Sequence, residues 1–235
     1  MATTIPSGAQ RREAVLGQIL ASRWTKVALF AICMIPFLLL LWPFSKLLTT
    51  GVAPELGANP VEFITHDTGD WTIRFLLITL CVTPLRKIFN QPRLARYRRM
   101  FGLFAFFYLC LHFMTWFILD KSFSFSDMWA DILKRRFITV GMLGFALLIP
   151  LAVTSTAGWV RRLGFAKWQR LHRLIYFAAL AGVIHYYWLV KSDVRLPLMY
   201  GAILAVLMGY RFFIWKQRPV ARGTATSPST ASLPD

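Results

Sequence analysis

Two histidines lie deep inside long apolar segments, where an imidazole is costly unless it has a partner. His112 lies within MFGLFAFFYLCLHFMTWFIL and His185 within LIYFAALAGVIHYYWLV. Hydrocarbon offers no hydrogen bonds, so an ionisable side chain at membrane depth marks a candidate functional site. Two facing imidazoles can share a heme iron as its axial ligands. The alternative is a hydrogen bond between two helices.

The composition is that of a membrane protein. Hydrophobic residues make up 57% of the 235 residues and charged residues only 16%, which leaves too little polar surface for a soluble domain. Six apolar stretches approach the roughly 20 residues that a helix needs to cross a bilayer. The sequence therefore predicts an all-α protein with a six-helix transmembrane bundle, its spans at about 27–44, 71–89, 100–119, 137–157, 171–190 and 196–215.

The net charge of +17 would suggest nucleic acid in a soluble protein, but here its distribution indicates membrane topology and no nucleic-acid partner. The 86–99 and 158–173 connections carry six and five bases and no acid, whereas acids are concentrated in the 45–70 and 120–136 connections. Basic loops face the cytoplasm. An even number of spans then places both termini in the cytoplasm.

The chain divides into three parts. We expect residues 1–22 to form a cytoplasmic N-terminal segment, 23–216 the six-helix transmembrane domain with the candidate heme site, and 217–235 a cytoplasmic tail whose small, polar, proline-containing composition predicts disorder. The first stretch has no small-residue cleavage pattern, so we expect a retained helix and not a signal peptide. The cysteines, all inside predicted spans, have no CxxC spacing, which argues against a disulfide framework or a zinc site.

The topology places both buried histidines in the outer half of the membrane. His112 lies about 12 residues into its span, or roughly 18 Å at 1.5 Å per residue. His185 lies shortly before the outer connection that begins at Lys191. We expect the two rings at similar depth on neighbouring helices, as a bis-histidine heme with its plane steeply inclined to the membrane requires.

The other two histidines are more ambiguous. His172 lies at the cytoplasmic entrance of the fifth span, and about 20 Å and a rotation of about 220° along a straight helix separate it from His185. It could bind a second, inner cofactor or be an interfacial histidine solvated by headgroups. His66, in THDTGDW, is expected in a loop as a hydrogen-bonded surface residue.

Four arginines are candidate partners of an anionic cofactor group. Arg74 could neutralise a heme propionate or a lipid headgroup, or extend to the interface without a specific partner. Arg161, Arg170 and Arg173 belong to the inner basic cluster. They could hold propionates or a flavin phosphate, although positive-inside anchoring explains them without any ligand.

The order of motifs resembles the MsrQ (YedZ) family of heme-binding membrane subunits. The signature stretch is TSTAGWVRRLG followed by KWQRLHRLIYFAALAGVIHYYWLVK, and further matches are GANPVEFITHDTGDW, LLITLCVTPLRK and RRMFGLFAFFYLCLH. Together they cover about residues 57–191.

The resemblance implies a multi-pass b-type cytochrome of the bacterial inner membrane, within the ferric-reductase-like transmembrane superfamily. Fifth-span histidines of that superfamily stand 13 apart, as His172 and His185 do, which implies that His172 is also a ligand. Larger members carry two third-span histidines where this chain has only His112, so the number of hemes, one or two, stays open. The resemblance also implies an FMN.

The family role is to pass electrons to MsrP, a periplasmic molybdenum-cofactor enzyme that reduces methionine sulfoxide in oxidised proteins. The donor would be the quinone pool or a cytoplasmic flavin reductase, because the sequence has no nucleotide-binding GxGxxG motif. The chain itself would not bind the sulfoxide. We therefore expect a one-electron relay through heme b, with His112 and His185 as axial ligands and His172 at an inner site or where electrons enter.

Two functions of other classes remain open. One is a transporter whose membrane histidines relay protons, although the spans lack the buried carboxylates and broken helices typical of many transporters. The other is a membrane anchor subunit without a cofactor. Heme absorbance in the purified chain distinguishes both from an electron relay.

Overall fold

The computed structural model describes residues 8–217, and every regular element in that range is helical. Residues 1–7 and all but the first residue of the predicted 217–235 tail lie outside the described residues. The α-helices are α1 Gly8–Ala21, α2 Arg23–Thr50, α3 Pro60–Ile88, α4 Ala95–Met114, α5 Phe125–Lys134, α6 Arg136–Val153, α7 Ala157–Leu163, α8 Phe165–Leu171, α9 Leu174–Leu189 and α10 Arg195–Lys216. Two short 3-10 turns, Pro54–Leu56 and Pro92–Leu94, and a π-helical segment, Thr115–Asp120, complete the set.

Four stretches are long and apolar enough to cross a membrane, namely Arg23–Thr50, Pro92–Asp120, Arg136–Val153 and Arg195–Ile214. The other two predicted spans fall short for different reasons. α9 has only 16 residues, and in α3 the charged Asp70, Arg74, Arg86 and Lys87 flank or interrupt the apolar run. The chain is therefore an all-helical membrane protein, and the count of six spans stays a prediction.

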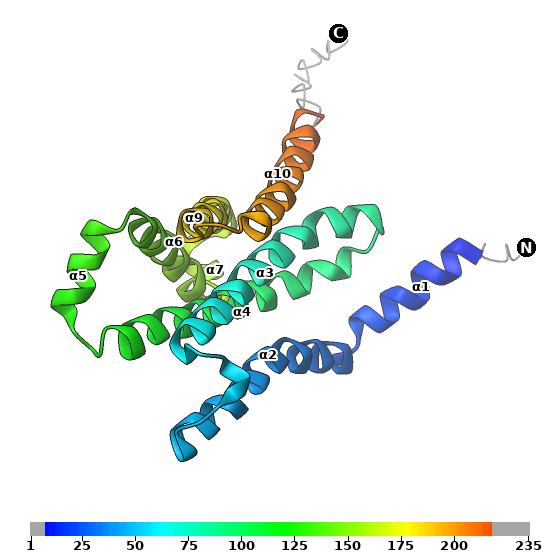
Figure 1. Cartoon of the computed structure of the whole chain (residues 1–235). Coiled ribbons are helices and arrows are strands. Elements are labelled where there is room, and N and C mark those ends of the chain that lie inside the picture. Colours follow the sequence, from blue (N-terminus) through cyan, green and yellow to red (C-terminus); the bar gives the residue numbers. More distant parts are fainter. Residues whose placement is uncertain (1–7, 218–235) are drawn as a thin grey trace, which may run out of the picture.

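Two helix pairs form the centre of the molecule (Figure 1). α3 and α4 run side by side in opposite directions, and α6 packs against α9 in the same way. α10 packs against both α9 and α3, and α2 lies along α4. The core between these helices includes the fully buried Leu80 and Ala105. The two pairs face each other, which leaves the space between them for a shared site.

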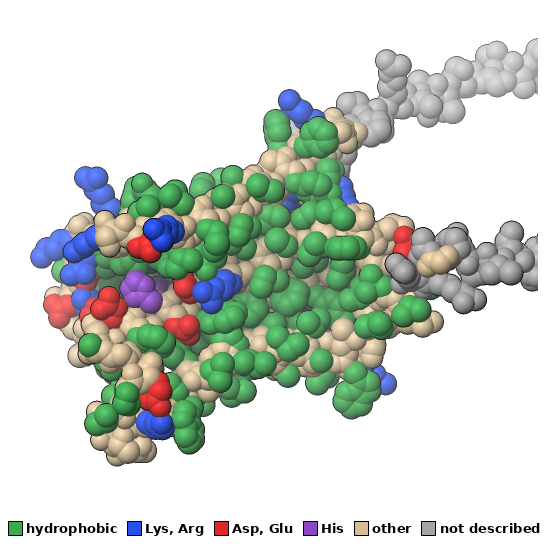
Figure 2. Space-filling view, turned by 45° about the vertical axis from the view of Figure 1, so that its right-hand side comes forward, with side chains coloured by type: hydrophobic (Ala, Val, Ile, Leu, Met, Phe, Trp, Pro, Cys, Tyr) green, Lys and Arg blue, Asp and Glu red, His purple; other side chains and the backbone are tan. Residues whose placement is uncertain are grey.

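The surface separates into an apolar body and a charged end. Figure 2 shows hydrophobic side chains over most of the visible body, while acidic and basic side chains and an exposed histidine gather at one end. α5 lies at one end of the bundle and α1 and the last turns of α10 at the other (Figure 1). Lipid is the natural solvent for such an apolar body, because soluble proteins rarely expose contiguous apolar patches of that size.

The helix that contains the second predicted span begins well before residue 71, and the expected loop position of His66 was wrong. Asn59 caps α3 by accepting a hydrogen bond from the Glu62 N–H, and Pro60 occupies the first turn, where its missing N–H costs nothing. These two signals start the helix at Pro60. Residues 60–70, expected in a polar connection, are therefore helical, and His66 lies in the second turn of α3.

The long connections also contain structure that was not predicted. α5 occupies most of 120–136, and α7, which begins at Ala157, and α8 occupy most of 158–173. The fifth span was expected as one helix over 171–190, but it breaks at His172–Arg173 and α9 begins at Leu174. The predicted angular relation between His172 and His185 assumed a straight helix and therefore does not apply.

Tyr108 of α4 replaces a backbone hydrogen bond that is missing from α2. Beside Pro36, the Tyr108 hydroxyl accepts a hydrogen bond from the Phe37 N–H at 3.1 Å and donates one to the Cys33 carbonyl at 2.9 Å. It thus stands between the two groups that would bond each other in a regular helix. This contact fixes α2 on α4 without any charged residue.

Pro84 creates a similar defect in α3, and Arg211 of α10 repairs it. Proline has no N–H, so the Leu80 carbonyl four residues earlier loses its helical donor. The Arg211 guanidinium donates to that carbonyl at 2.8 Å and to the Tyr176 hydroxyl at 2.5 Å. A membrane-embedded arginine here has a structural explanation, because it joins α3, α9 and α10.

We predict that Arg211→Met destabilises the chain by about 1–3 kcal/mol, the cost of an unsatisfied buried polar group. In a Pro84→Ala background the restored N–H can bond the Leu80 carbonyl, so the same substitution should cost less. Unfolding of the four variants in mixed detergent micelles measures this coupling. Equal costs of Arg211→Met in both backgrounds would contradict this role of Arg211.

Candidate heme site

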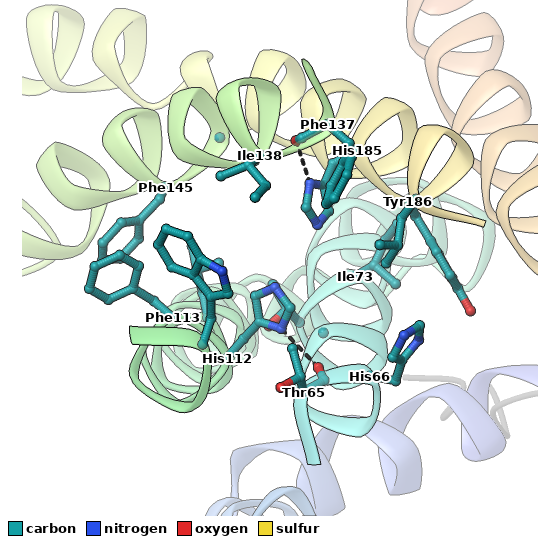
Figure 3. Close-up of a pocket in the computed structure, with 18 of the residues that line it drawn as sticks. Thr65, His66, Ile73, His112, Phe113, Phe137, Ile138, Phe145, His185 and Tyr186 are labelled. Atoms are coloured by element: carbon teal, nitrogen blue, oxygen red, sulfur yellow. Dashed lines mark hydrogen bonds between the residues drawn. The ribbon is translucent and has the colours of Figure 1, made fainter. Parts of the chain in front are cut away.

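A cavity of about 440 Å³ lies between the α3–α4 and α6–α9 pairs. This volume is in the range of small-molecule and cofactor sites, about 300–1,000 Å³. Its walls are mostly apolar and aromatic, including Ile73, Phe113, Phe137, Ile138 and Phe145, as Figure 3 shows. A flat, largely apolar cofactor with a few polar groups matches this lining.

His112 and His185 face each other across the cavity (Figure 3). Their ring centroids are 6.0 Å apart and their planes nearly perpendicular, at 86°. Two metal–imidazole bonds of about 2.0–2.1 Å each, together with the two ring radii, span a similar distance. The structure thus brings together two histidines that are far apart in sequence, at a separation that fits one metal ion between them.

Each imidazole is anchored through its Nδ1 atom. The Nδ1–H of His112 donates to the Thr65 carbonyl of α3 at 2.9 Å, and that of His185 donates to the Phe137 carbonyl of α6 at 2.6 Å. A proton on Nδ1 leaves the lone pair on Nε2, the form in which imidazole binds a metal. The unused nitrogens of both rings point into the cavity (Figure 3).

A glycine lies beside each ring, four residues after the carbonyl that the ring binds. A Cβ on Gly69 would be 3.1 Å from both Nδ1 and Cε1 of His112, and a Cβ on Gly141 would be 2.7 Å from Nδ1 of His185. In a helix, a side chain covers the turn before its own Cα. Glycine at this position therefore leaves the preceding carbonyl open to a ring from the neighbouring helix.

The two helix pairs thus hold their histidines by the same device. Thr65 and Gly69 of α3 act on His112 of α4, and Phe137 and Gly141 of α6 act on His185 of α9. The sequence analysis missed both glycines and both carbonyls. The only signal in the sequence was a glycine four residues after Thr65 and another four residues after Phe137. This signal is weak, because glycine is common in membrane helices.

The mouth of the cavity is polar. Among the described residues that line it are His66, Arg135 and three acids, Glu62, Asp70 and Asp120. His66 is exposed at the edge, close to His112 and His185 but not between them (Figure 3). Arg135, which the sequence analysis did not single out, is the one arginine among these lining residues.

The four arginines predicted as cofactor partners lie elsewhere. Arg74 donates to Asp70 at 3.2 Å and to the Tyr200 hydroxyl at 3.0 Å, and it does not line the cavity. Arg161, Arg170 and Arg173 are exposed near α7, α8 and the start of α9. Arg173 is about 18 Å along α9 from His185 at 1.5 Å per residue, so the cavity is separate from the basic cluster of Arg161, Arg170 and Arg173.

His172 lies in that inner region. Its Nδ1–H donates to the Trp168 carbonyl at 3.1 Å, and its ring packs on the Trp168 ring with centroids 4.0 Å apart. Its Nε2 is buried and has no hydrogen-bond partner in the described part of the chain. A buried nitrogen without a partner is consistent with a ligand position, but no second histidine of the described residues faces it.

Comparison with known proteins identifies the family. A model of the ferric reductase like transmembrane component matches residues 68–183. The protein-methionine-sulfoxide reductase heme-binding subunit MsrQ of Herminiimonas arsenicoxydans is 51% identical over 185 residues, which is 77% of this chain and 85% of the relative. The subunits of the same name from Caulobacter vibrioides and Xanthomonas euvesicatoria are 51% and 48% identical, over 76% and 85% of this chain and 84% and 90% of those relatives.

The chain belongs to the MsrQ family. The family resemblance read from the motifs is therefore confirmed. No solved structure matches the chain significantly, so the paired arrangement of carbonyl, glycine and histidine rests on this structure alone. The ferric-reductase-like region begins at Thr68 of α3 and ends at Val183 of α9, so it contains most of the two helix pairs that surround the cavity.

Proposed function

We propose that this chain holds a b-type heme between α4 and α9, with His112 and His185 as axial ligands, and serves as the electron-transfer membrane subunit of a methionine sulfoxide reductase system. The observation that carries the proposal is the pair of Nδ1-anchored imidazoles facing each other across one cavity. The names of the relatives, heme-binding subunits of such a system, support it.

Heme, when bound, supplies one-electron exchange at its iron. The contribution of the chain is positioning. The Thr65 and Phe137 carbonyls fix the tautomer and orientation of the two rings and make their Nε2 atoms better electron donors. If His112 and His185 both hold the iron, no coordination position would be left for oxygen, which would suit a relay better than an oxidase.

The propionates of a bound heme would be expected at the polar mouth of the cavity. We assign Arg135 as the arginine that can reach a propionate there, since it lines the cavity. Cofactor binding stays a prediction for four other arginines, Arg74, Arg161, Arg170 and Arg173. So does a second heme at His172, although its unpartnered Nε2 supports a ligand role.

We further propose six spans in a bacterial inner membrane, with α3 and α9 crossing among the four more apolar helices and both termini in the cytoplasm. The location of α1 and the end of α10 at the end opposite α5 (Figure 1) supports an even number of crossings. Neighbouring helices cover the polar residues of α3, as in the Arg74–Tyr200 contact. The heme cavity would then open toward the periplasm.

The electron acceptor in this proposal is a periplasmic MsrP-like molybdoenzyme, and the chain does not bind methionine sulfoxide itself. The donor, quinone pool or flavin reductase, and the FMN stay predictions from the family resemblance.

Transmembrane electron transfer is the direct test. In liposomes that contain the full chain, an impermeant reductant outside should reduce ferricyanide trapped inside much faster than in protein-free liposomes. His185→Ala should lower the rate to the protein-free level, because one imidazole cannot hold six-coordinate iron alone.

The same liposomes separate the alternatives. A trapped pH indicator would report histidine-dependent proton flux if the chain were a transporter. Equal electron flow with wild type, His185→Ala and no protein would contradict the relay.

A further inference from the structure

α5 has an apolar face that no part of the described chain covers. At about 100° per residue, Met128, Ile132, Phe125, Trp129 and Leu133 share an arc of about 140°. Met128 and Ile132 are half-buried, whereas Phe125, Trp129 and Leu133 are 69%, 60% and 70% exposed. Three large apolar side chains on one stripe of an exposed helix need an apolar neighbour.

The opposite face of α5 is polar and partly tied to the bundle. Asp131 pairs with Lys121 at 2.6 Å and with Arg135 at 3.4 Å, and Lys121 also pairs with Asp120 at 3.0 Å. The contact with Asp131 raises the pKa of the Lys121 ammonium, so this ammonium stays charged at neutral pH. Asp127 and Lys134 are exposed on the same side.

The flanking elements fix where α5 must lie. The apolar stretch before it ends at Asp120, and the next one starts at Arg136. Only residues 121–124 and Arg135 connect α5 to them, so it cannot leave the membrane surface. Figure 1 shows α5 lying across the end of the bundle.

The apolar stripe continues into the preceding membrane segment. Phe117 of the π-helical segment contacts the rings of Phe123 and Phe125, with centroids 5.6 and 5.0 Å apart. Phe123 is itself 59% exposed. Aromatic side chains at the end of a membrane-crossing helix are typical of the boundary between acyl chains and headgroups.

We propose that α5 is an interfacial helix, lying in the plane of the membrane with Phe125, Trp129 and Leu133 in the lipid at the acyl–headgroup boundary. Such helices bury one apolar face to about 5–10 Å and keep the polar face in water. Because Arg135 and Asp120 line the mouth of the heme cavity, this helix also sets the depth of that mouth relative to the lipid surface.

Spin labels on opposite faces of α5 test the proposal. In the full chain with Cys33, Cys81 and Cys110 changed to Ala, single labels are placed at Leu133→Cys and at the matched position Asp127→Cys. In phosphatidylcholine nanodiscs, the label at 133 should relax several-fold more with oxygen, which concentrates in lipid, than with an aqueous nickel complex. The label at 127 should show the reverse.

Two outcomes would overturn the proposal. Equal access of the nickel complex to both labels would place α5 in water, and exclusion of both reagents at 133 would mean that a protein covers this face. If the cysteine-free chain does not fold, Trp129→Phe in the native chain replaces the labels. It should remove a fluorescence component that brominated phosphatidylcholine quenches, and an unchanged quenched fraction would count against the lipid contact. Neither readout depends on heme content.

Discussion

Changing either His112 or His185 to alanine should abolish the low-spin heme signal of the purified chain. In the proposed site each ring would supply one nitrogen to the iron. Each ring is held by its own carbonyl, Thr65 or Phe137, so neither can substitute for the other. The remaining single imidazole cannot maintain a six-coordinate iron. Heme absorbance per chain and electron paramagnetic resonance of the ferric form measure the loss.

Two controls separate ligand loss from misfolding. His66→Ala removes an exposed histidine at the edge of the same cavity and should keep the full low-spin signal. Added imidazole, which can occupy the space left by His112→Ala or His185→Ala, should restore part of it. A full low-spin spectrum in either alanine variant without added imidazole would show that the ligand assignment is wrong.

Gly141→Ala should weaken heme binding strongly, although it replaces neither of the two proposed ligands. The new Cβ would be 2.7 Å from Nδ1 of His185 and 3.0 Å from its Cε1, so the ring must move and lose its bond to the Phe137 carbonyl. Loss of such an orienting contact typically costs about 10–100-fold in metal affinity. Heme titration of the apoprotein measures the change.

Glycine substitutions elsewhere provide a graded control. At Gly69 the new Cβ would meet His112 at 3.1 Å, and at Gly209 of α10 it would meet nothing within 4 Å. We expect the effect to decrease in the order Gly141, Gly69, Gly209, with Gly209→Ala neutral or slightly stabilising because alanine favours helix. A shifted ferric low-spin spectrum in Gly141→Ala, with unchanged helix content, would separate ring displacement from unfolding. Equal heme affinity in all three variants would refute the positioning role.

The sequence was most informative where an ionisable residue lies within an apolar segment. His112 and His185 were identified because each is ionisable inside an apolar run, and the charge distribution predicted that they lie at similar depth. The contacts that hold the two rings, with the Thr65 and Phe137 carbonyls beside Gly69 and Gly141, were not predictable. A backbone carbonyl has no sequence signature, and only the packing of α3 on α4 and of α6 on α9 gives these glycines their meaning.

The errors in the fold had three physical sources. Residues 60–70 were expected in a loop because of their polar side chains, although the Asn59 cap and Pro60 are helix-start signals. The 120–136 connection was interpreted only from its charges, so the amphipathic spacing that predicts α5 within it was missed. No glycine or proline marks the helix break at His172–Arg173 in the sequence, so only the structure shows that α8 and α9 are separate helices.

The reduced-minus-oxidised visible spectrum of the detergent-purified full chain, with heme quantified per polypeptide, tests the central claim most directly. Bis-imidazole ligation by His112 and His185 predicts a six-coordinate, low-spin, b-type spectrum with at least one heme per chain. A folded, monodisperse chain that contains no heme after expression with adequate heme supply would contradict it.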